Sequence, residues 1–421
     1  MLQHKISTLK NGLRVVTSEM PGLASATIMV SIGGGSRYET KRVSGLFHFI
    51  EHMAFKGTKR RPTTLDISSE IDGVGGMFNA NTDKEITNYY IKLAADKLEL
   101  AFDILSDMLN NSLFKAEEIE KEKGVIVEEI HMRNDNYPVL AAVNFERIIY
   151  GDNPMGWDIA GEKETVTAFK RADFMEYISK YYYPKNIVLA VSGGVKEDQV
   201  LNLANKYFGS FTGDNKKVTT KYLAGVDGAQ VNVANKKTEQ GHFILGLPAL
   251  NRLDPRRYQL EVLSAILGGG MSSRLFMTIR EKYGLAYYVY GDAQYNTDSG
   301  FFVVGAGVKL DKIDQALELT LEELEKIKKD LTSKEIQRAK EMLKGQLVLA
   351  LEDSRAVAGR TSTQLVLDNK IITVQEVLKS IDAVTEEQLI AVAKEIFQKE
   401  KINLAVVGPF TKDTSFKKII S

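Results

Sequence analysis

Two histidines one helical turn apart, with a glutamate between them, are the residues of this chain best suited to chemistry. They are His48, Glu51 and His52 in the segment HFIEH, and the chain has only five histidines among its 421 residues. On an α-helix, residues i and i+4 lie on the same face, so both imidazoles can reach one metal ion. The pattern therefore predicts a metal-binding helix with a carboxylate beside the metal, an arrangement suited to acid–base chemistry.

The residues around this motif indicate that its helix is buried. Ser44 is a good N-cap and Gly57 suits the end of the helix, which together predict a capped helix of about three turns. The remaining positions are mostly apolar: Leu46, Phe47, Phe49, Ile50 and Met53. Because burying two imidazoles and a carboxylate without partners is costly, this setting favours a metal ion over a pair of ordinary histidines.

A third ligand must come from another segment, since a catalytic zinc usually has three protein ligands and one open position. The best candidate is EKEKGVIVEEI, residues 120–130, which we predict to be helical. Glu122 and Glu129 lie seven residues apart on one face of this helix. Glu128 is a further candidate. His131 is another conceivable ligand, but we expect it to be a surface residue or to contact a ligand.

Three segments together resemble the insulinase and mitochondrial processing peptidase family of zinc peptidases, also called the pitrilysin family, whose metal motif is inverted. The segments are HFIEHMAFKGT, EKEKGVIVEEI and SSRLFMTIREKYGLAYYVYG, and the resemblance covers nearly the whole chain. It implies one Zn²⁺ per chain, held by His48, His52 and Glu129. Glu128 remains the competing third ligand, because the spacing from the second histidine varies by a residue within the family.

The resemblance also implies the chemistry, that of a zinc-dependent endopeptidase. Zinc lowers the pKa of a water molecule and polarises the scissile carbonyl. Glu51 is implied as the general base that accepts the proton of the water, and Glu122 as an additional acid that supports catalysis. The alternative, from a different class, is a non-catalytic or partner-dependent subunit of a processing peptidase-like complex.

Substrate binding and assembly follow from the same resemblance. Phe78, Asn79 and Ala80 resemble the family's exposed edge strand, to which an extended peptide adds through main-chain hydrogen bonds. Arg280 and Tyr287 resemble the pair that contacts substrate and stabilises the tetrahedral intermediate. Two such chains face each other in the family, so we expect a homodimer or a related second subunit, with this pair reaching the partner's zinc.

One departure from the family concerns substrate choice. Members that process presequences carry acidic residues on the helix after the third ligand, and these residues read arginine. The corresponding stretch here, residues 139–143, is VLAAV and has none. The resemblance therefore does not predict presequence processing, and peptide substrates are expected without a defined cleavage preference.

The chain repeats itself with a period of about 215 residues, which indicates duplication. Three matches share this offset: Asn81-Thr82-Asp83 with Asn296-Thr297-Asp298, Asp96-Lys97 with Asp311-Lys312, and Leu189-Ala190-Val191 with Leu404-Ala405-Val406. Strand-like and helix-like patterns follow the first two matches in both copies. We predict two homologous α+β domains, 1–212 and 218–421, each a mainly antiparallel sheet packed with helices.

The repeat offset also compares the metal motif with its second copy. Leu263, Ile266 and Leu267 stand where the first copy has His48, Glu51 and His52. Apolar side chains cannot bind a metal ion. We therefore expect the first domain to be the zinc-binding catalytic domain and the second to lack the metal site.

Composition excludes several other classes of function. The chain has 55 basic and 55 acidic residues, so it has no net charge with which to attract nucleic acid or an anionic membrane. It has no cysteine, hence no disulfide or thiolate ligand. No apolar run reaches the ~18 residues of a membrane span, and the first residues lack a secretory signal. We expect a soluble, cytoplasmic protein that binds neither nucleic acid nor membranes.

Overall fold

The computed structural model describes residues 3–215, 221 and 228–420, and the chain divides into two compact units. The first unit comprises Met1–Ile130, Trp157–Thr220 and Val348–Ile372, and the second comprises His131–Gly156, Lys221–Leu347 and Thr373–Ser421. Each unit thus includes a segment from the other half of the chain. Residues 216–220, at the predicted junction between the domains, lie outside the described residues.

The first unit is built on a six-stranded sheet. Its strand order is β1-β2-β6-β3-β5-β4, and all neighbours are antiparallel except β2 and β6. The strands are β1 (His4–Thr8), β2 (Arg14–Glu19), β3 (Ser25–Ile32), β4 (Met77–Thr82), β5 (Thr87–Ala94) and β6 (Ile187–Gly193). Since β4 pairs only with β5, it forms one edge of the sheet.

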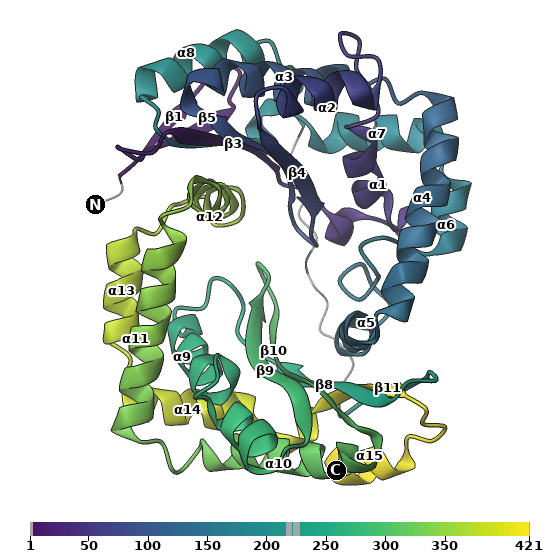
Figure 1. Ribbon diagram of the computed structural model, residues 1–421, viewed down its shortest axis with the longest axis vertical. Helices are drawn as coiled ribbons and strands as arrows, with labels where there is room; N and C mark the ends of the chain where they lie inside the picture. Colours follow the sequence, from purple (N-terminus) through teal and green to yellow (C-terminus); the bar gives the residue numbers. More distant parts are fainter. Residues whose placement is uncertain (1–2, 216–220, 222–227, 421) are drawn as a thin grey trace. The chain divides into compact units, whose positions relative to one another are not determined.

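Helices cover both faces of this sheet. The helices of the unit are α1 (Leu46–Met53), α2 (Thr64–Asp72), α3 (Leu98–Asn111), α4 (Ala116–Asp135), α6 (Lys163–Ala168), α7 (Arg171–Tyr181), α8 (Glu197–Phe208) and α12 (Ser354–Leu367). Helices α3 and α8 pack on one face, and α12 packs against β3 and β6 on the other (Figure 1). The last residues of α4 are assigned to the second unit.

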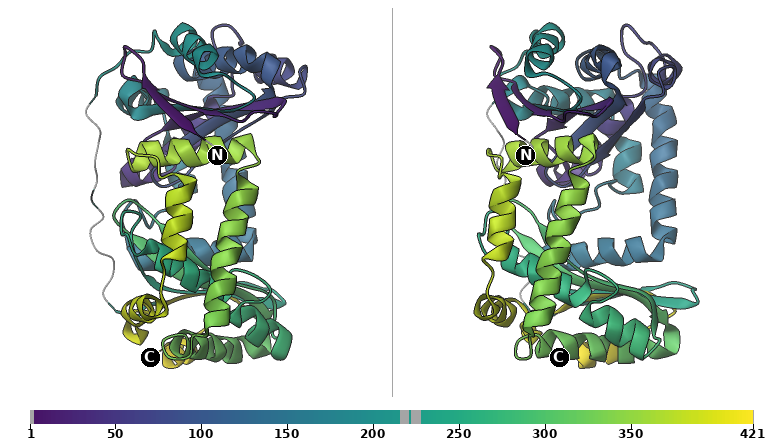
Figure 2. Two further views of the ribbon diagram at one scale, coloured as in Figure 1. Left: turned by 90° about the vertical axis from the view of Figure 1, so that its left-hand side faces the viewer. Right: turned by 60° about the vertical axis from the view of Figure 1, so that its left-hand side comes forward.

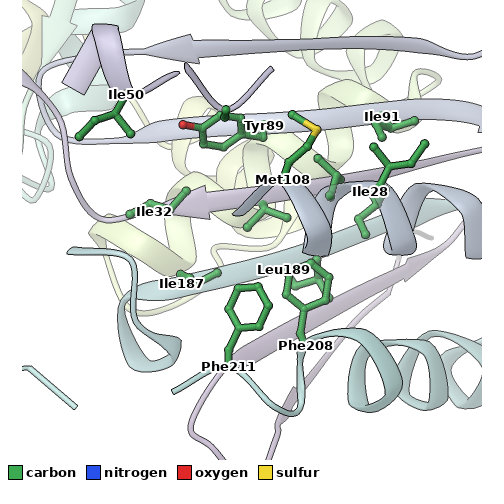
Figure 3. Close-up of a cluster of buried hydrophobic side chains, with 14 of the residues drawn as sticks. Ile28, Ile32, Ile50, Tyr89, Ile91, Met108, Ile187, Leu189, Phe208 and Phe211 are labelled. Carbon is green, nitrogen blue, oxygen red and sulfur yellow. The ribbon is translucent and has the colours of Figure 1, made fainter. Parts of the chain in front are cut away.

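An apolar core lies between the sheet and the helices that include α1 and α3. Figure 3 shows part of it, including Ile28, Ile32, Ile50, Tyr89, Ile91, Met108, Ile187, Leu189, Phe208 and Phe211. Alternate residues of β3 and β5 point into this core, as expected for a sheet that buries one face against helices. The core fixes α1, and with it the HFIEH motif, against the sheet.

The second unit repeats this arrangement with a five-stranded sheet of order β7-β11-β8-β10-β9. Its strands are β7 (Val231–Asn235), β8 (Gln240–Pro248), β9 (Ala286–Tyr295), β10 (Gly300–Lys309) and β11 (Asn403–Gly408). Its helices are α5 (Tyr137–Tyr150), α9 (Arg257–Gly268), α10 (Ile313–Lys326), α11 (Ser333–Ala350, whose last three residues belong to the first unit), α13 (Val374–Asp382), α14 (Glu386–Ile396) and α15 (Thr414–Ile420). Helices α11 and α13 run side by side (Figure 2), joined by an ion pair between Lys344 and Asp382.

The structure confirms the predicted duplication and fold class. Helix α10 begins and ends 215 residues after α3, and α14 does the same relative to α7. The strand order of the second sheet matches that of the first without β1. The two units exchange equivalent helices: α5 packs on β8 and β11 of the second sheet, as α12 packs on the first.

No helix of the described residues is both long enough and apolar enough to cross a lipid bilayer.

Candidate metal centre

Helix α1 carries the motif, but it begins differently from the prediction. It covers eight residues, and its N-cap is Gly45 rather than Ser44. Gly45 has a φ of +96°, and a Cβ at this position would lie 2.6 Å from the carbonyl oxygen of Ala160. Glycine is therefore required, and it leaves the helix without a side-chain cap of its own.

A carboxylate from an earlier loop caps α1 instead. Glu39 accepts hydrogen bonds from the backbone N–H of Gly45 (2.8 Å) and of Phe47 (2.7 Å), one to each oxygen. Burial raises the pKa of Glu39 to about 8, although these N–H donors and the charge of Lys84 act in the opposite direction. The predicted burial of α1 is confirmed, since Leu46, Phe47, Phe49, Ile50 and Met53 are almost fully buried.

His48, His52 and Glu129 come together as a group that could hold a metal ion. The Nε2 atoms of both histidines lie 3.6 Å from Oε2 of Glu129, and one ligand atom from each residue lies within 4.8 Å of the others. Two ligands about 2.0–2.1 Å from a tetrahedral zinc are about 3.3 Å apart, so these residues fit zinc. Within the described part of the chain, no other such group of His, Asp or Glu side chains occurs.

The two alternative ligands proposed from sequence lie elsewhere. Glu128 is exposed on α4 and is not part of the group, while its neighbour Glu129 is half-buried. His131, three residues after Glu128 on the same helix, is exposed, as expected. The geometry thus favours Glu129 because the helical rotation between adjacent residues turns Glu128 away from α1.

Glu122, one of the residues on the same face of α4, contacts the other side of His52. Its Oε1 lies 2.9 Å from His52 Nδ1, and its Oε2 pairs with Lys56 Nζ at 2.6 Å. A proton on Nδ1, donated to Glu122, leaves the lone pair of Nε2 directed toward Glu129 and a metal. Burial alone would raise the pKa of Glu122, but the hydrogen bonds of His52 and Lys56 outweigh it and lower the pKa.

Glu51 lies at the same site, and a residue of the sheet holds its side chain. It is 9% exposed, and Oγ1 of Thr82, the last residue of the edge strand β4, donates a hydrogen bond of 2.5 Å to its carboxylate. Burial raises the pKa of Glu51, while the bond from Thr82 opposes this shift. A carboxyl with a raised pKa beside a metal site is suited to accept and return a proton near neutral pH.

Three residues of this site were not predicted from the sequence. Thr82 belongs to the repeated Asn-Thr-Asp triplet and was noted only as a marker of the repeat. Lys56 lies one turn after His52, a spacing that could have indicated its contact with Glu122. Glu39 had no such signal, because it lies seven residues before the first residue of the helix that it caps.

The predicted substrate-binding residues form an accessible strand edge. Phe78, Asn79 and Ala80 lie on β4, in which exposed and half-buried residues alternate. The N–H of Ala80 donates to the side-chain oxygen of its neighbour Asn79 at 2.8 Å. An extended peptide that adds to this edge would compete with the Asn79 amide for that donor.

Arg280 and Tyr287 belong to the second unit and lie together there. Arg280 lies on a π-helical segment (Phe276–Lys282) and donates a hydrogen bond of 2.7 Å to the carbonyl oxygen of Tyr287. Its guanidinium also lies over the rings of Phe276 and Tyr287, 4.9 and 5.6 Å from their centroids. Tyr287 is 77% exposed, so its phenol is accessible.

In the second unit, apolar side chains stand at the positions equivalent to the metal-binding face of α1. Leu263, Ile266 and Leu267 of α9 are at most 2% exposed. At the end of α9, Gly268 lies directly against β9, since a Cβ there would be 1.9 Å from the backbone nitrogen of Gly291. This close contact leaves no space between helix and strand at that point.

Fold and site together define a two-domain α+β protein with a candidate His-His-Glu metal centre in its first unit. Residues 14–163 match the family model described as "Insulinase (Peptidase family M16)", and residues 168–343 match the model "Peptidase M16 inactive domain". An uncharacterized zinc protease of Streptomyces coelicolor is 38% identical over 96% of this chain and 89% of its own length. The uncharacterized zinc protease YmxG of Bacillus subtilis is 35% identical, covering 96% and 97%. The chain belongs to the insulinase (M16) peptidase family.

Solved structures agree with this assignment. A protease from Helicobacter pylori is 27% identical with a TM-score of 0.92, covering 97% of this chain and 100% of that one. A peptidase M16 inactive domain from Pseudomonas fluorescens has a TM-score of 0.90 over 97% and 98% of the two chains. At 19% identity, that second likeness concerns the fold alone.

Proposed function

We propose that this chain is a zinc-dependent endopeptidase that hydrolyses extended peptides. The observation that carries the proposal is the convergence of His48, His52 and Glu129, with Glu51 at the same site. These donors, two imidazoles and one carboxylate, suit zinc and leave one position open. A bound zinc ion would supply Lewis acidity, lowering the pKa of water and polarising the scissile carbonyl.

The protein's own residues would perform the remaining steps. Glu51 accepts a proton from the attacking water and passes it to the leaving amine. Thr82 orients the Glu51 carboxylate, and Glu122 holds His52 with its Nε2 toward the metal. These contacts come from β4 and α4, so the rigid elements of the first unit hold base and ligands together.

Substrate would bind along β4. A peptide that pairs with Phe78, Asn79 and Ala80 is held through main-chain hydrogen bonds, which favour unfolded or short peptides over folded proteins. The scissile carbonyl would then receive hydrogen bonds from Arg280 and Tyr287 as negative charge develops on its oxygen. We infer that a homodimer, or a related second subunit, supplies this pair to the zinc centre of its partner.

One observation favours a second candidate, a partner-dependent or non-catalytic subunit. The match of residues 168–343 is to a model described as an inactive domain. Size-exclusion chromatography followed by a peptidase assay of each fraction distinguishes the two candidates. Activity of the pure chain excludes an obligate different partner, while activity that requires a second protein would favour the subunit.

Metal analysis of a matched pair of variants tests the proposed centre. Glu129→Gln removes the third ligand, while Glu128→Gln changes the exposed carboxylate beside it on α4. We expect one zinc per chain in the wild type and in Glu128→Gln, with chelator-sensitive cleavage of a quenched fluorescent peptide, and loss of both zinc and cleavage in Glu129→Gln. A wild-type chain that binds no zinc would overturn the proposal.

A further inference from the structure

Four charged residues are buried beside the N-terminus of α1, outside the metal group and its direct contacts. Arg37, Glu39, Lys84 and Glu85 are each 4–5% exposed. Burying ionisable side chains is costly unless they are paired or hydrogen-bonded, so four such residues at one place need a reason. Two belong to the loop that leads to α1, and two belong to the turn between β4 and β5.

These two segments are tightly joined. Arg37 Nη1 pairs with Glu85 Oε1 at 2.7 Å, and both side chains are buried. The backbone N–H of Arg37 donates to the carbonyl oxygen of Lys84 at 2.8 Å. Lys84 in turn donates from Nζ to the carbonyl oxygen of Trp157 at 2.7 Å, close in sequence to the Ala160 that presses on Gly45. An ion pair and hydrogen bonds therefore hold together the backbone segments around the start of α1.

Glu39 is the member of this cluster that holds the helix. The first N–H groups of a helix have no partners within it, and the required glycine at position 45 supplies no side chain. Glu39 accepts hydrogen bonds from two of these N–H groups, one with each of its carboxyl oxygens. Its carboxyl group thus sets where α1 starts and how the helix is rotated about its axis.

The same β4–β5 segment also contacts the other end of the motif. Thr82 bonds Glu51, one turn into α1 from His48, while Lys84, two residues later, acts electrostatically on Glu39. One short segment, next to the proposed peptide-binding edge, therefore bonds the base Glu51 and also interacts with Glu39, the cap of the helix N-terminus.

We infer that Glu39 is a positioning residue for the metal centre: by capping α1 from a distance, it places His48 and His52 opposite Glu129. The inference rests on the proposed function. In a helix of eight residues, a shift at the first turn is transmitted directly to His48, the third residue. The metal ligands, rather than the substrate edge, would be displaced when the cap is weakened.

The test compares Glu39→Gln and Glu39→Asp with Glu376→Gln in the full chain. Gln keeps the size of Glu39 but presents an N–H₂ group to one of the two N–H donors, and Asp keeps both carboxyl oxygens but withdraws them by one methylene. Glu376 caps α13 in the second unit, accepting from the N–H of Thr373 at 2.7 Å, and serves as the matched control. The measurements are Zn²⁺ affinity by competition with a chelating dye, the visible spectrum of the Co²⁺-loaded chain, and kcat and KM for a peptide.

We expect Glu39→Gln to weaken Zn²⁺ binding by about 10–100-fold, the range known for residues that orient metal ligands. Its Co²⁺ spectrum should change, and kcat should fall more than KM changes. Glu39→Asp should be intermediate, and Glu376→Gln should match the wild type in metal affinity and spectrum.

Wild-type Zn²⁺ affinity and Co²⁺ spectrum in a folded Glu39→Gln chain would overturn the inference, even if its melting temperature falls, because Glu39 would then be only a helix cap. If Glu39→Gln fails to fold, the same two measurements on Glu39→Asp decide the question. A wild-type chain without metal would overturn the proposed function, a result distinct from both.

Discussion

Helices α1 and α9 occupy equivalent positions in the two units, but they present opposite chemistry. Helix α1 directs two imidazoles toward Glu129 of α4 and a carboxylate toward Thr82 of β4, whereas the equivalent residues of α9 are leucine and isoleucine in an apolar core. Helix α9 also packs directly on its hairpin through Gly268, while α1 keeps a polar contact between Glu51 and Thr82. The fold therefore does not require the metal site, which depends on a few side chains and on space beside the strand.

The two helices also differ in the free-energy cost of burying their side chains. An apolar face is the less costly solution for a buried helix, and the second unit has it. The first unit retains buried polar groups and surrounds them with partners, including Glu122, Lys56 and Thr82. A costly arrangement of this kind indicates a functional site more strongly than the motif does alone.

The largest effect is expected when α1 is converted to the pattern of α9. The double variant His48→Leu, His52→Leu should bind no zinc and lose peptidase activity down to the background rate. In the presence of chelator it should melt below the wild type under the same conditions, because the buried Glu122 loses its hydrogen bond to His52. Zinc analysis and calorimetry test this, and a double variant that retains stoichiometric zinc would refute the assigned ligands.

In the second unit, a larger residue at position 268 should lower the stability of the fold, because α9 packs closely on β9 there. Gly268→Ala places a Cβ against the backbone of Gly291, and overpacking of this kind costs about 1–3 kcal/mol. The control is Gly345→Ala, within α11 and with no atom near the added Cβ, which should stabilise by up to about 1 kcal/mol. Denaturant unfolding measures both, and equal effects would contradict the proposed close contact.

The smallest of these effects is expected when the hydrogen bond between Thr82 and Glu51, which has no equivalent at α9, is removed. Thr82→Val removes the hydrogen bond to Glu51, and the loss of a bond to a charged group corresponds to about a tenfold fall in kcat. Thr297→Val changes the equivalent threonine of the second copy and should leave kcat unchanged. Zinc content should be normal in both variants. Equal kcat values for the two would show that Thr82 does not orient the base.

Much of the fold and of the candidate metal centre could be predicted from the sequence, including features that periodicity alone does not indicate. The 215-residue offset gave the duplication and the correspondence of α1 with α9 because identical turn residues occur in both copies. The i, i+4 histidines and the i, i+7 glutamates of α4 were predictable since helical geometry fixes which residues share a face. The assignment of roles to Arg280 and Tyr287 depended on family resemblance.

Other features could not be predicted, for physical reasons. Ser44 is a favourable cap by residue type, yet the backbone of Ala160 lies so close to Gly45 that the helix starts one residue later, with Glu39 as its cap. The exchange of α5 and α12 between units is also not visible in local patterns, because an amphipathic helix does not specify which sheet it covers. Both features depend on contacts between segments far apart in sequence.

The most direct test of the account is the behaviour of Glu51→Gln. This variant keeps all three proposed ligands and the size of the side chain, but it cannot accept a proton. We predict one zinc per chain, as in the wild type, with kcat reduced by about 10²–10⁴-fold. A Glu51→Gln chain with full zinc and wild-type kcat would contradict the central claim that this helix pairs a metal site with a general base.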